Sequence, residues 1–420
     1  MNGRLTLSGI VDGLRESLWF IPAIALVLAV LVAELSPIFD DVLVAPPWYS
    51  TDAESARALL GAIATATLTL TGLVFSITML VLQLTSSQLS PRVMGRFLRD
   101  RHNQVVLALF ISTFAYALLA LRSVEEEEVR TFSVWVGFAM AMVSVVAFIH
   151  YIDHMAKSIR ASTVIAEIAT ETRGTIERMY PDPVESDREE SGDWLDEPDT
   201  QVAWTGKAGV VTDVDIEAMR EIARRRGVRL ALIPMVGDFV PSGAPVFNVW
   251  GALGEEDADD LQSTARLARE RTPIRDVGFG FRQLVDIAER ALSPGVNDPT
   301  TAVQAIDQIH DLLRTLATRE LGPEVRRDDE GEAVAIVRHP GWGAFVGLAV
   351  DEIRISGQGS LQTNRRLRFL LEDVMTVAPP RRQNALRIQL TLLDEGLQRG
   401  FDLALDRDAA ARASARGHGD

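Results

Sequence analysis

Apolar residues gather in four stretches within residues 1–155 of the chain. The stretches are Leu18–Leu35, Leu59–Leu84, Gln104–Leu121 and Phe132–Ile152. A helix of about 20 apolar residues crosses a hydrocarbon core of about 30 Å, and each stretch approaches or exceeds that length. Their central parts contain no Asp, Glu, Lys or Arg, since Glu34 lies at an end. The pattern predicts an α-helical polytopic membrane protein with four transmembrane helices, and it disfavours a proton-coupled carrier.

The second stretch, Leu59–Leu84, carries small and polar residues at helical spacing. A helix of about 26 residues is about 39 Å long, which exceeds the hydrocarbon core. Residues three, four or seven positions apart share one side of a helix, and here they are Thr65, Thr69, Gly72, Ser76 and Gln83. One interpretation is a stripe that lines a hydrated path. The other is close helix packing through small residues, with hydroxyl groups bonded to backbone carbonyls.

Charges in the loops predict the orientation of these helices. Cytoplasmic loops carry an excess of Lys and Arg, and basic residues predominate after the second and fourth stretches. They are Arg92, Arg96, Arg99, Arg101, Lys157 and Arg160. We therefore expect residues 89–103 and 153–420 inside the cell, and residues 37–57 and 122–131 outside. Both termini would then lie on the cytoplasmic side of a bacterial inner membrane.

The rest of the chain predicts an α+β cytoplasmic region in four parts. Residues 156–201 favour a helical stalk followed by an acidic linker, and residues 202–251 a small β-rich module with a helix at Ile216–Arg226. Residues 252–400 favour a helical domain. Residues 401–420 favour the end of a helix and a disordered tail. The membrane domain, residues 1–155, precedes these parts.

Hydrophobic periodicity also places elements within the helical domain. The expected helices are Glu255–Arg271, Arg275–Leu292, Pro299–Arg319, Trp342–Ile355, Leu361–Val377 and Pro380–Arg399, and the expected strand is Ala333–Val337. In the β-rich module, the turns Gly206–Val210 and Val236–Gly243 resemble the half-repeats of lipoyl- and biotinyl-like barrel sandwiches. No lysine occupies the segment between those turns, so we expect no carrier role.

Composition argues against several classes of function. The chain has no cysteine, which excludes disulfides, thiol catalysis and cysteine-ligated metals. The net charge of −16 divides into −2 for residues 1–160 and −14 for residues 161–420, and this acidic balance argues against nucleic acid as a partner. The motifs GxSxG, HExxH and GxxxxGK[ST] are absent. We therefore expect no enzyme activity, no catalytic residues and no cofactor.

Two histidines, His150 and His154, lie four residues apart near the end of the fourth stretch. That spacing places both imidazoles on one side of a helix and suits a metal ion. A zinc site needs a third ligand, however, and polar aromatic residues commonly end a membrane helix at the interface. We expect no metal site here.

The motif ALSPGVNDPTTA, at Ala291–Ala302, separates two expected helices. Its Pro and Gly suit the end of one helix, its Asn and Asp suit the cap of the next, and Pro299 fits the first helical position. The alternative is that the turn binds an ion or a small ligand, with Asn297, Asp298 and Thr300 as the candidate residues. We favour the structural turn.

Three short motifs carry a resemblance to a known family. They are FSIT at residues 75–78, QLTSSQLSPR at residues 83–92 and ALSPGVNDP at residues 291–299. The chain resembles the bacterial predicted membrane-protein family catalogued as domain of unknown function 2254, from the first membrane helix to about residue 400. The resemblance implies an inner-membrane protein with four spans and a cytoplasmic C-terminal region. It implies no substrate, reaction or catalytic residue.

Two functions from different classes remain. The leading hypothesis is an oligomeric channel-like or transport protein, in which the second helix of each subunit lines a central path for ions. Arg92 and Arg96, with the acidic cytoplasmic domain, would then lie at the inner mouth. The alternative is a membrane-anchored sensor or scaffold that binds a cytoplasmic protein. The lipid bilayer and further copies of the chain are the expected partners.

Overall fold

The structure is a computed structural model, and it describes residues 20–42, 52–88, 92, 100–124, 131–184 and 196–414. The side chains of residues 37–42 and 86–88 lie outside this description. The chain divides into two compact units, Met1–Arg160 and Ala161–Asp420. Each unit is described by itself.

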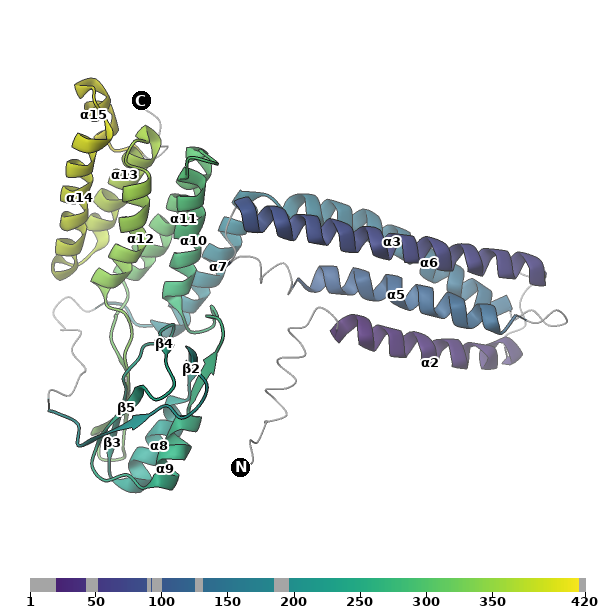
Figure 1. The fold of residues 1–420 in the computed structure, drawn as a ribbon, viewed down its shortest axis with the longest axis horizontal. Helices are drawn as coiled ribbons and strands as arrows, with labels where there is room; N and C mark the ends of the chain where they lie inside the picture. The colour runs from purple at the N-terminus through teal and green to yellow at the C-terminus, as the bar shows by residue number, and fades with distance from the viewer. Residues whose placement is uncertain are drawn as a thin grey trace. The chain divides into compact units, whose positions relative to one another are not determined.

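The first unit consists of long helices that lie side by side (Figure 1). They are α2 (Phe20–Val42), α3 (Ala53–Gln88), α5 (Arg101–Arg122) and α6 (Thr131–Ser158). Helix α5 packs against each of the other three. Among the described residues, Ala53–Thr85, Arg101–Arg122 and Thr131–Ser158 are long and apolar enough to cross a membrane. The apolar part of α2, Phe20–Ser36, is shorter, so length and composition support three of the four expected spans.

Hydroxyl groups join the helices inside the first unit. Thr113 Oγ1 of α5 lies 3.1 Å from Ser144 Oγ of α6. Ser133 Oγ donates to Ser36 Oγ at 3.0 Å, which ties α6 to α2. These pairs satisfy buried polar groups within the apolar helices, as the absence of water from a hydrocarbon core requires.

The second unit contains two sheets with helices packed against them. The strands are β1 (Thr200–Ala203), β2 (Gly209–Val214), β3 (Arg229–Leu232), β4 (Phe239–Val240), β5 (Pro245–Trp250), β6 (Ala265–Ala268), β7 (Glu324–Arg327) and β8 (Ala333–Val337). The larger sheet has the order β1-β5-β3-β8-β7, and the smaller has the order β4-β2-β6. Only β3 and β8 pair in parallel among the described strands, with Leu230 opposite Ala335.

The sheets and two helices share one hydrophobic core. The helices are α8 (Ile216–Arg226) and α9 (Glu255–Ser263). Met219 of α8, Phe247 of β5 and Leu261 of α9 are fully buried in this core. Helix α8 begins at the carboxylate cap of Asp215 and ends at Gly227, whose φ of 65° is the left-handed conformation that favours glycine.

The sheet pairing corrects three expectations about the β-rich module. Strands β6, β7 and β8 come from outside residues 202–251 and complete its sheets, so the module is not continuous in sequence. The expected helix Glu255–Arg271 ends at Ser263, and the following residues form β6 beside β2. An open mixed sheet with a parallel pair also replaces the resemblance to a barrel sandwich.

The remaining helices of the second unit form a bundle. They are α7 (Ala161–Met179), α10 (Val277–Leu292), α11 (Pro299–Ala317), α12 (Trp342–Ser356), α13 (Leu361–Val377), α14 (Pro380–Gly400) and α15 (Ala404–Ala410). The expected helix boundaries agree with α10 to α14 within about two residues, the usual uncertainty of helix ends. Residues 404–410, at the start of the expected disordered tail, form α15, which packs against α13 and α14.

Helix α7 occupies the segment expected as a stalk, and it packs against α10 and α11. Its contact with α10 requires Gly280, because a Cβ atom there would lie 2.0 Å from Oγ1 of Thr172. Gly280 is thus a close-packing position between two helices. This contact explains why glycine occupies position 280.

Candidate functional site

The small and polar residues of α3 lie together on an exposed face of the first unit. Thr65, Thr69, Gly72, Ser76 and Gln83 are all exposed in the single chain. The hydroxyls of Thr65, Thr69 and Ser76 donate to the carbonyls four residues earlier, at 2.8 to 2.9 Å. A Cβ atom on Gly72 would meet nothing within 4 Å. We call these five residues the α3 stripe.

The opposite side of α3 packs inside the unit. Leu60, Val74 and Val81 are buried there. Thr78 is also buried, and its Oγ1 lies 2.9 Å from the hydroxyl of Tyr151 on α6. At about 100° per residue, these positions fall on the side of the helix away from the α3 stripe. Within the single chain, the α3 stripe therefore faces away from the helices that pack against α3.

The two arginines expected at the inner mouth follow α3 in the sequence. Arg92 is exposed, and Arg96 lies outside the described residues. Their role at a mouth stays a prediction.

The turn between α10 and α11 forms a helix cap. Asp298 accepts hydrogen bonds from the backbone nitrogen of Thr301 at 3.1 Å and from its hydroxyl at 2.6 Å. Pro299 occupies the first turn of α11. Asn297 has a φ of 49°, a conformation that asparagine tolerates better than most residues. Thr300 is exposed. The carboxylate proposed as a ligand is thus engaged in starting a helix.

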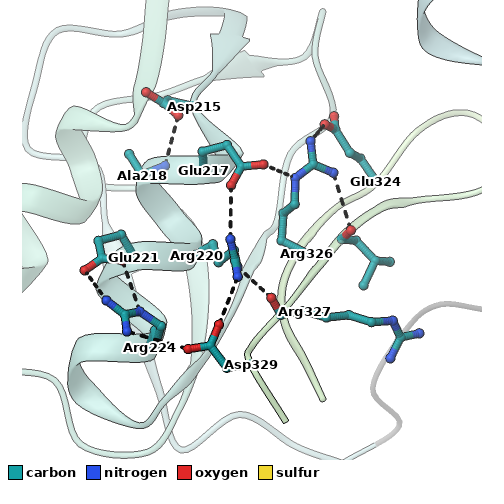
Figure 2. A network of polar contacts seen from close by, with 11 residues as sticks. Asp215, Glu217, Ala218, Arg220, Glu221, Arg224, Glu324, Arg326, Arg327 and Asp329 are labelled. Atoms are coloured by element: carbon teal, nitrogen blue, oxygen red, sulfur yellow. Dashed lines mark hydrogen bonds and ion pairs between the residues drawn. The ribbon is translucent and has the colours of Figure 1, made fainter. Parts of the chain in front are cut away.

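Charged residues join α8 to the hairpin of β7 and β8 (Figure 2). Glu217 of α8 accepts a hydrogen bond from Arg326, which also donates to Glu324 at 2.8 Å. Nε2 of His339 lies 3.9 Å from Oε2 of Glu324. His339 and the adjacent Arg275 lower the pKa of Glu324 to about 2, against the opposing effect of burial. These ion pairs and hydrogen bonds connect α8 to the sheet within the second unit and stabilise the sheet.

A histidine and an aspartate also lie together between α11 and α13. Asp373 Oδ2 lies 2.7 Å from Nε2 of His310, and Arg366 Nη2 lies 2.9 Å from Nδ1. Arginine can only donate, so Nδ1 accepts and Nε2 carries the proton. Burial lowers the pKa of His310, which favours this neutral ring. Both nitrogens are taken by partners that join two helices, so neither remains to accept a proton from a substrate.

Three histidines and one aspartate meet where α5 begins and α6 ends. The ring centroid of His102 lies 4.7 Å from that of His150 and 4.4 Å from that of His154. Asp100 caps α5 by accepting from the backbone nitrogen of His102 at 2.9 Å. Its other oxygen lies 2.7 Å from Nε2 of His154. We call these four residues the histidine cluster.

Sequence reasoning identified only the two histidines of α6 in this cluster. Asp100 lies 54 residues before His154, and only the antiparallel packing of α5 on α6 brings them together. A signal was present in the sequence, since His102 and Asp100 stand at one end of a predicted span. Among the residues that the structure describes, no group of three or more His, Asp or Glu could hold a metal ion.

These features define a helical membrane protein with a second unit of mixed α+β structure. The chain belongs to the DUF2254 family of predicted membrane proteins, whose model matches residues 15–373. It is 31% identical to the uncharacterized protein Mb1321c of Mycobacterium bovis over 96% of this chain and 81% of that protein. The same values hold for the uncharacterized protein Rv1290c of Mycobacterium tuberculosis. No solved structure matches the chain.

Proposed function

We propose that this chain is one protomer of an oligomeric channel-like or transport protein of the bacterial inner membrane. In this proposal α3 lines a central path and the acidic second unit lies at its cytoplasmic mouth. The observation that carries the proposal is the α3 stripe, which is exposed in the protomer while the opposite side of α3 packs inside the unit. A polar face that no helix of its own protomer covers suits a water-filled path between subunits.

The proposed topology has four transmembrane helices, including α2, and both termini in the cytoplasm. The excess of arginine after α3 supports this orientation. Because the chain has no cysteine, a thiol reagent labels only the single cysteine that is introduced, and this labelling shows on which side of the membrane the residue lies. We expect Ser55→Cys to react with an impermeant maleimide in intact cells, and exposed Ser242→Cys to react only after lysis. Labelling of Ser242→Cys in intact cells would contradict the orientation.

Conduction tests the proposed path directly. We expect the purified protein to carry current in planar bilayers. We expect Ser76→Leu to reduce that current, because the larger apolar side chain narrows the path and disfavours water in it. Ala66→Leu is the matched control, since Ala66 is exposed on α3 but lies outside the α3 stripe. Equal effects of both substitutions, or no current under varied salt, pH and tension, would reject the channel.

A specific observation favours a membrane-anchored scaffold as the second candidate. The hydroxyls of the α3 stripe donate to carbonyls of their own helix, and small residues let two helices approach closely. The stripe could thus form a dry interface between protomers while the second unit binds a cytoplasmic protein. A structure of the assembly in lipid distinguishes the two, because a channel has an axial cavity along α3 and a scaffold has packed helices there.

A further inference from the structure

We propose that one end of the helix bundle in the second unit docks on the surface of the lipid bilayer. The side chains that enter the headgroup region are those of Val296, Leu403 and Leu405, and we call these three residues the apolar tip. The lipid is that of the bilayer that α6 crosses. The inference does not depend on conduction or on oligomerisation, because it concerns one chain and the lipid around it.

The start of α7 identifies the end of the bundle to which the membrane helix α6 is joined. Helices α7 and α11 run in the same direction, as two contacts show. Arg173 donates to the hydroxyl of Thr315 at 3.0 Å, and Arg319 donates to the carbonyl of Pro181 at 2.7 Å. Counting back from both contacts places Ala161, the first residue of α7, level with the start of α11. The start of α7 and the turn before α11 therefore lie at the same end of the bundle.

Two further connections lie at this end. Ser356, the last residue of α12, donates to Glu289 in the last turn of α10 at 3.2 Å. Gln358 donates to the carbonyl of Gly396 at 3.1 Å, so the last turns of α14 lie beside the end of α12. Helix α15 follows α14 and lies against α13 and α14 (Figure 1). The apolar tip thus combines the turn before α11 with the residues that lead into α15.

The apolar tip is exposed although the bundle has a well-buried core. Val296 is 41% exposed, Leu403 is 65% exposed and Leu405 is 81% exposed. Among the described residues of both units, Leu405 is the most exposed large apolar side chain. Removing such side chains from water is favourable, so a surface that covers the apolar tip would stabilise the docked state.

The short link between α6 and α7 selects lipid as the occupant. Helix α6 ends at Ser158 and α7 begins at Ala161, so the link spans at most about 11 Å, three steps of about 3.8 Å. The apolar stretch of α6 ends at Ile152, about 9 Å before Ser158 along the helix. The chain itself therefore keeps the start of α7 within about 20 Å of the hydrocarbon edge. The end of the bundle that carries the apolar tip includes this start.

Two arginines at this end suit the anionic headgroups of a cytoplasmic leaflet. Arg160 directly precedes α7, Arg399 lies in the last turn of α14, and both are exposed. Their guanidinium groups make no hydrogen bond or ion pair with any residue that the structure describes, so both are available to lipid phosphates. Asp402 and Asp406 lie beside the leucines and oppose this attraction. We therefore expect apolar contact to contribute most of the docking.

The test attaches an environment-sensitive fluorophore to the full chain, which has no cysteine of its own. The labelled variants are Leu405→Cys and Val296→Cys at the apolar tip, with Ile274→Cys as the matched control. Ile274 is 64% exposed and precedes α10 at the opposite end of that helix. The protein is placed in nanodiscs of equal parts phosphatidylcholine and phosphatidylglycerol, with and without lipids brominated near the headgroup. We expect bromolipid to quench both labels at the apolar tip and to leave Ile274→Cys unquenched.

Substitution of the leucines tests the apolar contact itself. With the label on Val296→Cys, we expect Leu403→Ser combined with Leu405→Ser to lower the ratio of docked to undocked protein about 10-fold or more. Emission in bromolipid nanodiscs should then recover. Ile388→Ser is the control, because Ile388 is an exposed apolar residue of α14 that lies about 18 Å from the end of this helix. It should leave the quenching unchanged.

Melting temperatures verify that every labelled variant is folded, and the two labels at the apolar tip test the contact independently. Absence of quenching at both labels, or equal quenching of Ile274→Cys, would overturn the proposal. A blue-shifted label at Leu405→Cys that bromolipid does not quench would also overturn it, because a protein surface rather than lipid would then cover the apolar tip.

Discussion

The two units of this chain differ in how many large apolar side chains they leave exposed. In the first unit, large apolar residues such as Val146 and Ile149 are exposed, and small or hydroxyl residues such as Ser144 are fully buried. In the second unit, Phe281 and Ile306 are fully buried. Lipid solvates apolar side chains, so burying them gains little in a membrane, whereas water drives them into the core. The surrounding solvent thus decides which residues face outward.

The units also differ in whether their buried polar side chains carry a charge. Among the described residues, the buried hydrogen bonds between helices of the first unit involve uncharged groups, such as the hydroxyls of Thr113 and Ser144. The second unit buries Arg382, which donates to the carbonyls of Leu316, Ala317 and Arg319 at 2.8 to 3.2 Å. The carbonyls of Leu316 and Ala317 belong to the end of α11, the negative end of the helix dipole, and Arg319 follows two residues later. A buried charge is tolerated where the fold supplies acceptors for it.

The largest effect we expect comes from removing that buried charge. Arg382→Ala leaves the carbonyls at the end of α11 without a donor and removes the cation from above the Trp342 ring. We expect a loss of about 3 to 4 kcal/mol, measured by denaturant unfolding followed by tryptophan fluorescence. Arg387→Ala on the same helix removes an exposed hydrogen bond to Gln383 and should change stability by less than about 0.5 kcal/mol. Similar losses for both variants would contradict the role of Arg382.

A matched pair of substitutions tests the difference in solvent. Val146 of α6 is 67% exposed and Ile355 of α12 is 63% exposed. We expect Val146→Lys to cost about 2.5–3.5 kcal/mol, because it places a charge near the middle of a membrane helix. We expect Ile355→Lys to change stability by less than about 0.5 kcal/mol. Melting temperatures in lipid nanodiscs measure both, and equal tolerance at the two positions would place α6 outside the bilayer.

Acid should weaken the second unit through Glu324. Its pKa is lowered from 4.5 to about 2 in the folded protein, so the carboxylate stabilises the fold above about pH 4.5. That contribution is lost as the pH falls from 4.5 towards 2. The full shift corresponds to about 3 kcal/mol, and partial exposure reduces it to about 1–2 kcal/mol.

Denaturant unfolding at pH 6 and pH 3 measures this effect in the full chain. We expect Glu324→Gln to lower stability at pH 6 and to reduce the difference between the two pH values. Glu330→Gln, at the exposed tip of the same hairpin, is the control and should keep the difference. An unchanged pH dependence in Glu324→Gln would assign acid sensitivity to other carboxylates.

The smallest effect we expect is at the turn before α11. Asp298→Ala removes the cap of the helix and should cost about 1 kcal/mol, whereas exposed Thr300→Ala should cost less than about 0.5 kcal/mol. Thermal unfolding measures both variants. If Asp298→Ala kept its melting temperature yet abolished a measured current or ligand affinity, the turn would become a binding site rather than a cap.

Local sequence determined most of the helices, because each of these carries its own signal. Apolar length marked α3, α5 and α6, and the Asp298 cap with Pro299 marked the start of α11 within one residue. The helix α8 and the strand β8 also agree with the predicted bounds. Helix caps, proline positions and hydrophobic periodicity depend on residues a few positions apart, so the local sequence is enough to recognise them.

Tertiary structure alone decided which distant segments meet. Strand β8 lies beside β3 although about 100 residues separate Leu230 from Ala335, and His102 reaches His154 only through the packing of α5 on α6. The α3 stripe was visible in the sequence, but its exposure depended on which side of α3 the other helices cover. Such contacts depend on the packing of complementary surfaces far apart in the chain, and no short pattern of residues specifies them.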